Sequence, residues 1–315
     1  MGKNKINHIL VIRLSAMGDV AMTVPVLKAL TAQHPNLKIT LLTRAFYSPM
    51  FTDLANVSIY QADVNGKHKG ILGLWRLFKE LKTMGIDAVA DLHNVLRSNI
   101  LKRFFTLNNI PFSQIDKGRK EKRALTAGKN KIFEPLKTTF ERYADVFCKL
   151  GFPIKLANLS VLPKRVLPQK VQEVIGPDNL KWIGIAPFAA YPGKMYPFEL
   201  MEEIIKTLNN TNKYKIIFFG GGDSQKKQAQ KWSDHYQNCI NAIGRMSFED
   251  ELALISNLDL MLSMDSGNGH LAAMFNIPTI TLWGITHPYA GFTPFNQSSD
   301  NSLLSDRDKF PFIPT

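Results

Sequence analysis

Two acidic residues stand where short apolar runs give way to glycine-containing turns. Asp19 follows the run HILVIRL and the turn SAMG, and Asp265 follows LDLMLSM and opens the turn DSGNGH. A helix-period pattern comes next in both places, so each acid lies where a strand passes into a helix. Ligands of α/β proteins bind at the carboxyl ends of parallel strands, which makes both turns candidate sites for catalysis or binding.

The first turn suits acid–base chemistry. Asp19 can act as a general base that takes the proton from an attacking hydroxyl group. A helix start favours the charged carboxylate and makes it a weak base, which suffices if proton transfer is late and the leaving group departs readily. The alternative is a capping role, which is common for Asp at a helix start. The turn holds one glycine, Gly18, and lacks the G-x-G-x-x-G pattern of a dinucleotide-binding turn.

The second turn suits phosphate binding. Ser266, Gly267 and Asn268 place backbone N–H groups at the start of a helix, where these donors and the helix dipole attract an anion. His270 lies in the first helical turn and can donate to a phosphate oxygen, with packing or capping as the alternative. Asp265 would repel phosphate, so we expect it to accept hydrogen bonds from sugar hydroxyls.

Two further turns complete the candidate site. Lys194 ends the loop after an apolar run at 181–186, where a cation can neutralise the charge on a departing nucleoside diphosphate; the alternative is an ordinary surface lysine. A glycine run with Gly221 follows the next apolar run and, with Asp223 beside it, permits close approach of a nucleotide. No D-x-D-type cluster lies near these turns, so we predict that no metal is needed.

The elements that position these turns alternate between strand and helix, which predicts parallel sheets covered on both faces. We expect helices near 20–33, 69–83, 94–107 and 135–150 and between the later strands, one with a capping box of Ser247 and Asp250. The stretch from about 286 is rich in Pro and Ser, shows no helical period and is predicted to be loop or disordered tail. Strands are predicted at 8–14, 37–43, 57–60, 87–92, 110–115, 181–186, 214–219, 239–243, 258–264 and 278–283.

Length and composition favour two domains. A chain of 315 residues with 45% hydrophobic content exceeds the size at which single cores usually stop growing. Residues 158–170 contain Pro163 and Pro168, break the alternation and are predicted to be the linker. We therefore predict an α/β fold with two Rossmann-like domains, 1–163 and 164–315, whose parallel sheets face a central cleft.

The charge and the cysteine content indicate what kind of partner and which cellular compartment to expect. The formal net charge is +13, and residues 117–131 hold seven Lys or Arg against one Glu. This segment can attract an anionic partner, although a solvated loop is an equal alternative. Two cysteines make a disulfide framework improbable, and no apolar run reaches the length needed to span a bilayer. We expect a cytoplasmic protein.

Taken together, ILVIRLSAMGDVAMTVPVLKAL, GKMYPFEL, the block from GRMSFED to DSGNGHLAA and PTITLWG resemble the ADP-heptose:lipopolysaccharide heptosyltransferases, glycosyltransferase family 9. The resemblance extends over roughly residues 8–285. It implies a GT-B fold and an inverting, metal-independent transfer of a heptose or related sugar from an ADP-sugar to an anionic inner-core acceptor of lipopolysaccharide. It needs no cofactor beyond the nucleotide-sugar substrate. We expect a monomer, and association with the cytoplasmic face of the inner membrane fits such an acceptor.

The resemblance also assigns residues. Asp19 matches the proposed catalytic base, and the Lys194 and Asp265–His270 turns match donor diphosphate and sugar contacts. Met246 matches the position whose backbone meets the adenine. On the acceptor side, DLHNVLRSN offers His93 and Arg97, with helix capping and solvated charge as alternatives, and the basic segment adds Arg119 and Lys120.

One departure and two rival classes remain open. The family commonly has a glutamate after the glycine run, where this chain reads GGGDSQKKQ, so another nucleotide sugar is an alternative donor. A Rossmann-type oxidoreductase should show G-x-G-x-x-G after the first strand. A nucleic-acid-binding protein should interleave its basic residues with aromatics or carry them on a recognition helix, and 117–131 is predicted to be a loop and contains no aromatic residue. We therefore predict no nucleic-acid partner.

Overall fold

The computed structural model describes residues 5–157, 161–177, 179–306 and 308–310. The chain divides into two compact units, the first made of 1–119 and 137–160 and the second of 120–136 and 161–315. The predicted domains, 1–163 and 164–315, differ from this division mainly in the segment 120–136. That segment belongs with the second unit because its ends contact it: the Leu136 N–H donates to the Tyr289 carbonyl, and the Lys122 ammonium lies 4.0 Å from the Phe292 ring centroid.

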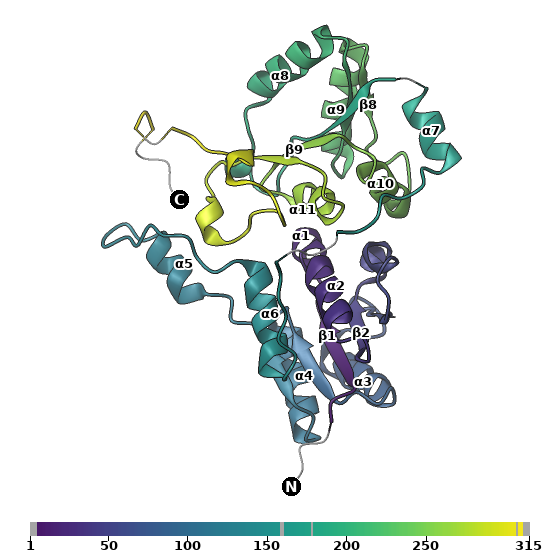
Figure 1. Cartoon of the computed structure of the whole chain (residues 1–315), viewed down its shortest axis with the longest axis vertical. Coiled ribbons are helices and arrows are strands. Elements are labelled where there is room, and N and C mark those ends of the chain that lie inside the picture. Colours follow the sequence, from purple (N-terminus) through teal and green to yellow (C-terminus); the bar gives the residue numbers. More distant parts are fainter. Residues whose placement is uncertain (1–4, 158–160, 178, 307, 311–315) are drawn as a thin grey trace. The chain divides into compact units, whose positions relative to one another are not determined.

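The first unit is built on a parallel sheet that has five strands in the described part of the chain, in the order β3-β2-β1-β4-β5. Its strands β1 and β2 are labelled in Figure 1. β1 is buried throughout and is apolar from Ile9 to Ile12, as the centre of a doubly covered sheet requires. The core on one face joins β1 to α3 and α4 through buried residues such as Leu10, Leu77 and Phe105. The strands are β1 (His8–Ile12), β2 (Lys38–Thr43), β3 (Val57–Gln61), β4 (Ala88–Asp91) and β5 (Phe112–Gln114).

The helices of the first unit mostly match the predicted ones. The predicted helix at 20–33 is divided into α1 and α2 at Met22 because Pro25 lacks the N–H that would bond the Ala21 carbonyl. α6 begins after Thr138, whose hydroxyl accepts the Glu141 N–H. The 3₁₀ helix η1 has no counterpart among the predicted elements. These helices are α1 (Met17–Ala21), α2 (Thr23–Gln33), η1 (Ala45–Phe51), α3 (Gly70–Lys82), α4 (Leu96–Leu107) and α6 (Thr139–Lys149).

The second unit repeats the plan with a parallel sheet of six strands within the described residues, in the order β11-β10-β9-β6-β7-β8. Its core packs Trp232 of α9 and Met201 of α8 against β6 and β7. Each of the ten predicted strands overlaps one of β1 to β10. The strands are β6 (Lys181–Ala186), β7 (Tyr214–Phe218), β8 (Cys239–Asn241), β9 (Leu260–Met264), β10 (Thr279–Leu282) and β11 (Ser302–Leu303).

Three segments of the second unit differ from or refine the predictions. Residues 119–125, predicted as part of a loop, form the helix α5, which Leu125 anchors as a buried side chain. The stretch after 286 contains two 3₁₀ turns and β11. Residues 158–160 of the predicted linker lie outside the described residues, and 161–168 form neither helix nor strand. The helices are α5 (Arg119–Leu125), α7 (Gln169–Ile175), η2 (Pro192–Lys194), α8 (Phe198–Asn210), α9 (Asp223–His235), α10 (Phe248–Ile255), α11 (Gly267–Met274), η3 (Pro288–Ala290) and η4 (Ser299–Asn301).

Candidate functional site

Asp19 lies in the first turn of α1, directly beyond the carboxyl end of β1. It is the third residue of the helix and not its N-cap, which is Ala16. Its carboxylate forms an ion pair with the guanidinium of Arg13, whose side chain is buried, while the Asp19 side chain is 35% exposed. Arg13 is itself fixed by a 2.6 Å hydrogen bond from Nη1 to the Leu92 carbonyl. The ion pair orients the carboxylate and leaves one side of it open to a ligand.

Tyr143 of α6 contacts the backbone of this turn. Its hydroxyl donates to the Asp19 carbonyl at 3.2 Å, and the Arg13 guanidinium lies 5.8 Å from its ring centroid. Burial raises the pKa of Tyr143 far above its usual value, so the phenol stays neutral and keeps its donor. The helix α6 thereby holds the backbone of the candidate base.

His93 lies next to the same turn, at the end of β4. The buried Asp91 carboxylate accepts the N–H groups of His93 and Asn94 at 2.9 and 3.1 Å, which fixes the loop. The His93 Nε2 atom is 3.3 Å from the Ser15 hydroxyl. Burial, followed by the charges of Arg13 and Lys117, lowers the pKa of His93 to about 3. The imidazole is therefore neutral at physiological pH and can exchange hydrogen bonds but cannot supply a positive charge.

Cations instead come from residues near the strand ends: Arg13 and Arg44 were not predicted as site residues, whereas Lys117 belongs to the basic segment 117–131 that was predicted to attract an anion. Arg13 follows β1, Arg44 follows β2, and Lys117 lies three residues beyond β5. All three act on His93 electrostatically, and burial together with Arg13 and Arg119 lowers the pKa of Lys117. The signal was present in the sequence, because a basic residue soon after several parallel strands marks one sheet edge as positive. This edge can bind an anionic ligand.

The other acceptor-side candidates are more peripheral. Arg97 is exposed near the start of α4, and Arg119 and Lys120 are exposed at the start of α5. Of these, Arg119 acts electrostatically on Lys117. Ser98 serves as a helix cap, since its hydroxyl accepts the Val95 N–H at 3.0 Å.

In the second unit, Lys194 and Asp265 meet at the carboxyl edge of the sheet. The Lys194 Nζ atom is 2.6 Å from Asp265 Oδ2, and the Thr286 hydroxyl donates to the same oxygen at 2.8 Å. The Gly193 carbonyl accepts the Ile285 N–H at 3.0 Å, and a side chain at Gly284 would collide with that carbonyl. The loops after β6 and β10 are thus fixed against each other, and they hold Lys194 in place.

The turn at the start of α11 supplies donors beside this pair. Ser266 is the N-cap, but its side chain accepts no capping hydrogen bond, and its buried hydroxyl has no partner among the described residues. Asn268 and His270 are buried in the first turn. Gly269 faces the strand rather than a ligand, because a Cβ there would lie 2.6 Å from the Ser263 hydroxyl. The N–H groups of the turn and Ser266 can therefore receive an anion.

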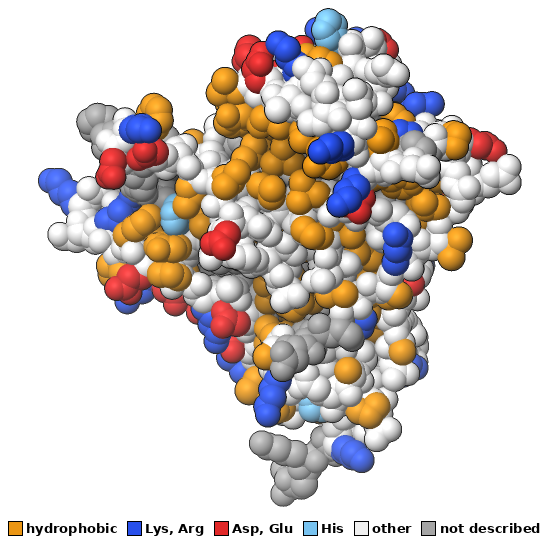
Figure 2. All heavy atoms as spheres, turned by 45° about the horizontal axis from the view of Figure 1, so that its top comes forward, with side chains coloured by type: hydrophobic (Ala, Val, Ile, Leu, Met, Phe, Trp, Pro, Cys, Tyr) orange, Lys and Arg blue, Asp and Glu red, His pale blue; other side chains and the backbone are white. Residues whose placement is uncertain are grey.

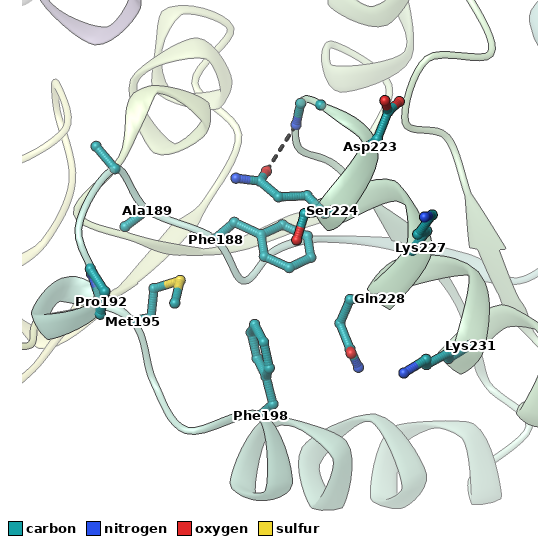
Figure 3. Close-up of a pocket in the computed structure, with 14 residues that line it drawn as sticks. Phe188, Ala189, Pro192, Met195, Phe198, Asp223, Ser224, Lys227, Gln228 and Lys231 are labelled. Carbon is teal, nitrogen blue, oxygen red and sulfur yellow. Dashed lines mark hydrogen bonds between the residues drawn. The ribbon is translucent and has the colours of Figure 1, made fainter.

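A pocket of about 820 Å³ lies between the loop after β6, the glycine turn after β7 and α9 (Figure 3). Gly221 and Asp223, the predicted donor contacts of this turn, are among its lining residues, and the Gly221 N–H donates to Gln225 Oε1 at 2.9 Å. Met246 is half-buried and is not one of its lining residues. Pro192 and Met195, on either side of Lys194, also line the pocket.

The lining is apolar on one side and polar on the other. Phe188, Phe198 and Met195 form an apolar wall, in which the two phenylalanine rings pack edge to face, while Lys227 and Lys231 project from successive turns of α9 (Figure 3). Figure 2 shows hydrophobic side chains gathered in the upper part of the view, with Lys and Arg side chains beside them. Such a wall can take the ring of a nucleoside, and the cations favour its charged groups.

The described residues contain no group of three or more His, Cys, Asp or Glu side chains arranged to hold a metal ion. None of their helices is both long and apolar enough to cross a bilayer.

Known structures share this fold. A glycosyltransferase of family 9 from Veillonella parvula superimposes with a TM-score of 0.75 at 21% identity, over 95% of this chain and 86% of that one. The heptosyltransferase WaaC of E. coli with ADP gives a TM-score of 0.69 at 18% identity, over 94% and 92% of the two chains.

Sequence comparison gives the family. Lipopolysaccharide heptosyltransferase 1 of Campylobacter coli is 24% identical over 297 residues, which cover 89% of this chain and 85% of that protein. The lipopolysaccharide core heptosyltransferase OpsX of Haemophilus influenzae is 23% identical over 88% of this chain and 79% of its own length. The model of glycosyltransferase family 9 (heptosyltransferase) matches residues 74–311. The chain belongs to this family.

Proposed function

We propose that the chain transfers a heptose from ADP-heptose to an anionic inner-core acceptor of lipopolysaccharide, with inversion at the anomeric carbon and without a metal ion. The observation that carries this proposal is the Lys194–Asp265 pair beside the α11 turn, with the pocket beginning at the neighbouring Pro192 and Met195. The relatives named above, which are heptosyltransferases of lipopolysaccharide, support the sugar and the acceptor.

The donor is bound by the second unit. The pocket receives the nucleoside, and the diphosphate lies against the N–H groups of α11, where the helix dipole favours an anion. Lys194 neutralises the charge that develops on the departing diphosphate, which a metal ion does in other enzymes. Asp265 aligns Lys194 and is placed to accept hydrogen bonds from the sugar.

The acceptor is activated by the first unit. Its hydroxyl attacks the anomeric carbon as the bond to the diphosphate oxygen breaks, and the hydroxyl proton passes to the Asp19 carboxylate. A single displacement of this kind inverts the anomeric centre. Arg13 keeps Asp19 oriented, and the cations Arg44 and Lys117 attract the anionic groups of the acceptor.

Compartment and assembly follow from the same proposal. Cys148 and Cys239 are free thiols, which agrees with a reducing cytoplasm. We propose that a monomer acts there on an acceptor presented at the inner membrane.

The test is a direct assay of the donor and the product. The protein is incubated with ADP-heptose, other ADP-sugars, UDP-sugars and GDP-sugars, each with a deacylated inner-core acceptor, and products are read by mass spectrometry and NMR. Transfer from ADP-heptose with inverted configuration and undiminished rate in EDTA is expected. Transfer from a UDP-sugar alone would favour the alternative donor, and loss of turnover in EDTA that magnesium restores would refute the metal-free mechanism.

A further inference from the structure

The outer face of α3 and α4 in the first unit is apolar where a solvated surface is expected to be polar. Ile71, Leu72 and Leu107 are 66%, 84% and 82% exposed. The two helices carry five of the fifteen large apolar residues that are exposed among the described residues, the others being Trp75 and Leu96. Both helices are labelled in Figure 1. Apolar exposure concentrated in this way marks an interaction surface.

The exposed residues belong to one continuous face. On α3, Leu72, Trp75 and Lys79 recur at spacings of three and four, so they point the same way. On α4, the half-buried Ile100 and Phe104 and the exposed Leu107 follow the same rule. The two stripes meet because the Trp75 and Phe104 rings lie 5.1 Å apart. The ends of the helices are joined by a 2.7 Å hydrogen bond from Lys82 to Asn108.

The charges on this face have one sign. Arg76, Lys79, Lys82 and Arg103 are exposed, and the Lys79 ammonium lies 5.4 Å from the Trp75 ring centroid. The one acid on the two helices, Glu80, is already bonded to Tyr60, Lys67 and His68. Its negative charge is thereby offset, and the face as a whole is positive.

We propose that this face, formed by Ile71, Leu72, Trp75, Leu107 and the surrounding cations, binds the surface of an anionic lipid bilayer. Apolar side chains and a tryptophan bordered by Lys and Arg are the composition of helices that lie in the membrane interface. Lipid headgroups of negative charge complement the cations, and the chains below them receive Leu72 and Ile71. This property goes beyond the transferase reaction, because it needs neither donor nor acceptor.

Vesicle binding by the full chain tests the proposal without any substrate. Flotation is compared on vesicles of phosphatidylcholine alone and of phosphatidylcholine with phosphatidylglycerol, at low and high salt. Binding to the anionic vesicles that weakens with salt is expected. The tryptophan emission should shift to the blue on binding, and Trp75→Phe should abolish that shift, since Trp232 and Trp283 are buried already and the half-buried Trp182 lies on β6 of the second unit.

Two variants separate the apolar and the electrostatic contributions. Ile71→Ser with Leu72→Ser should lower the partition coefficient roughly tenfold or more at every salt concentration. Arg76→Gln, Lys79→Gln and Arg103→Gln together should lower it comparably at low salt and flatten the salt dependence. Matched controls in the second unit are Val166→Ser, at a residue 90% exposed, and the triple variant Lys164→Gln, Lys181→Gln and Lys213→Gln.

The outcomes are distinct. Equal binding of the patch variants and the controls, or no binding of the parent protein, would overturn the proposal. So would sedimentation showing that the face instead joins two copies of the chain, with the dimer lost in the Ile71 and Leu72 variant and no effect on vesicles. Activity on a deacylated acceptor tests the transferase separately, because that substrate needs no membrane.

Discussion

At the scale of single residues, Asp19 is the most informative. As the third residue of α1 with a buried arginine as its partner, it is more than a helix cap. Asp19→Asn keeps the size of the side chain but cannot accept the proton, so kcat should fall about 10²- to 10⁴-fold. ADP affinity should be unchanged.

The unfolding free energy of Asp19→Asn is the control for the kinetic measurement. Loss of the ion pair leaves Arg13 without a carboxylate, which should cost about 1 to 2 kcal/mol of unfolding free energy, less than for a fully buried pair because Asp19 is partly exposed. Turnover and urea unfolding are measured on one preparation. A kcat within tenfold of the parent enzyme would remove Asp19 from the reaction.

Lys194 tests the donor site. Lys194→Gln removes the charge opposite Asp265 and should weaken ADP binding by about 1.5 to 3 kcal/mol, the range for a hydrogen bond to a charged group. Calorimetric titration with ADP measures the change, and Lys181→Gln, at an exposed lysine of β6, is the control. Equal affinities of the two variants would show that the diphosphate is bound elsewhere.

His93 gives a pH dependence. Its pKa is about 3 in the folded chain and about 6.5 in an unfolded one, so the unfolded state binds more protons between these values and stability falls as the pH is lowered through that window. From pH 7 to pH 5 this residue should account for up to about 2 kcal/mol. His93→Gln should reduce the pH dependence of the unfolding free energy by that amount. Parallel curves for parent and variant would contradict the burial of a neutral imidazole.

At the scale of elements, helices and strands with a regular apolar period were predictable from the sequence, whereas short elements without such a period were not. Strand runs such as 181–186 stand out because both faces are buried, and β6 has the predicted bounds. α5 was missed because four of its seven residues are Lys or Arg, which conceals the apolar period, and Leu125 alone is fully buried. The order of the strands within each sheet could not be inferred from the sequence pattern either.

Because the order of the strands could not be inferred from the sequence, only residues that are close in the sequence could be predicted to lie together in the site. Asp265, Ser266 and His270 lie within one short turn, so a local pattern places them together. Arg13, His93 and Lys117 come from three strand ends, and only the adjacency of β1, β4 and β5 brings them together. Local motifs therefore group the proposed donor residues together, whereas the positive edge of the first sheet emerges only from the order of its strands.

The exposed basic residues of α5 lead to a prediction about acceptor binding. Arg119, Lys120 and Arg123 are exposed, whereas Lys122 packs over Phe292. Changing the three exposed residues to Gln should raise the acceptor KM and flatten its salt dependence, with ADP affinity unchanged, because they act by long-range attraction. Lys122→Gln alone serves as a control that should lower stability and leave the salt dependence as it was. Identical kinetics at low salt would make α5 a solvated surface helix.

At the scale of the whole molecule, the net charge of +13 and the two parallel sheets admit three kinds of ligand, namely a nucleotide sugar, a dinucleotide and a nucleic acid. A ligand that binds only the folded chain raises the free energy of unfolding, by about 2.7 kcal/mol when the free ligand concentration is a hundred times its Kd. An oligonucleotide held only by surface charge loses its effect as salt rises. The three are therefore distinguishable by thermal unfolding.

We expect ADP and ADP-sugars to raise the melting temperature at both low and high ionic strength, because we propose that the pocket, Lys194 and the α11 turn form their specific binding site. NAD should have a smaller effect, since the turn at Gly18 lacks the dinucleotide pattern. An oligonucleotide should act at low salt only. Stabilisation by NAD equal to that by ADP-sugars, or by an oligonucleotide at high salt, would show that the pocket or the positive surface serves a ligand other than the proposed donor.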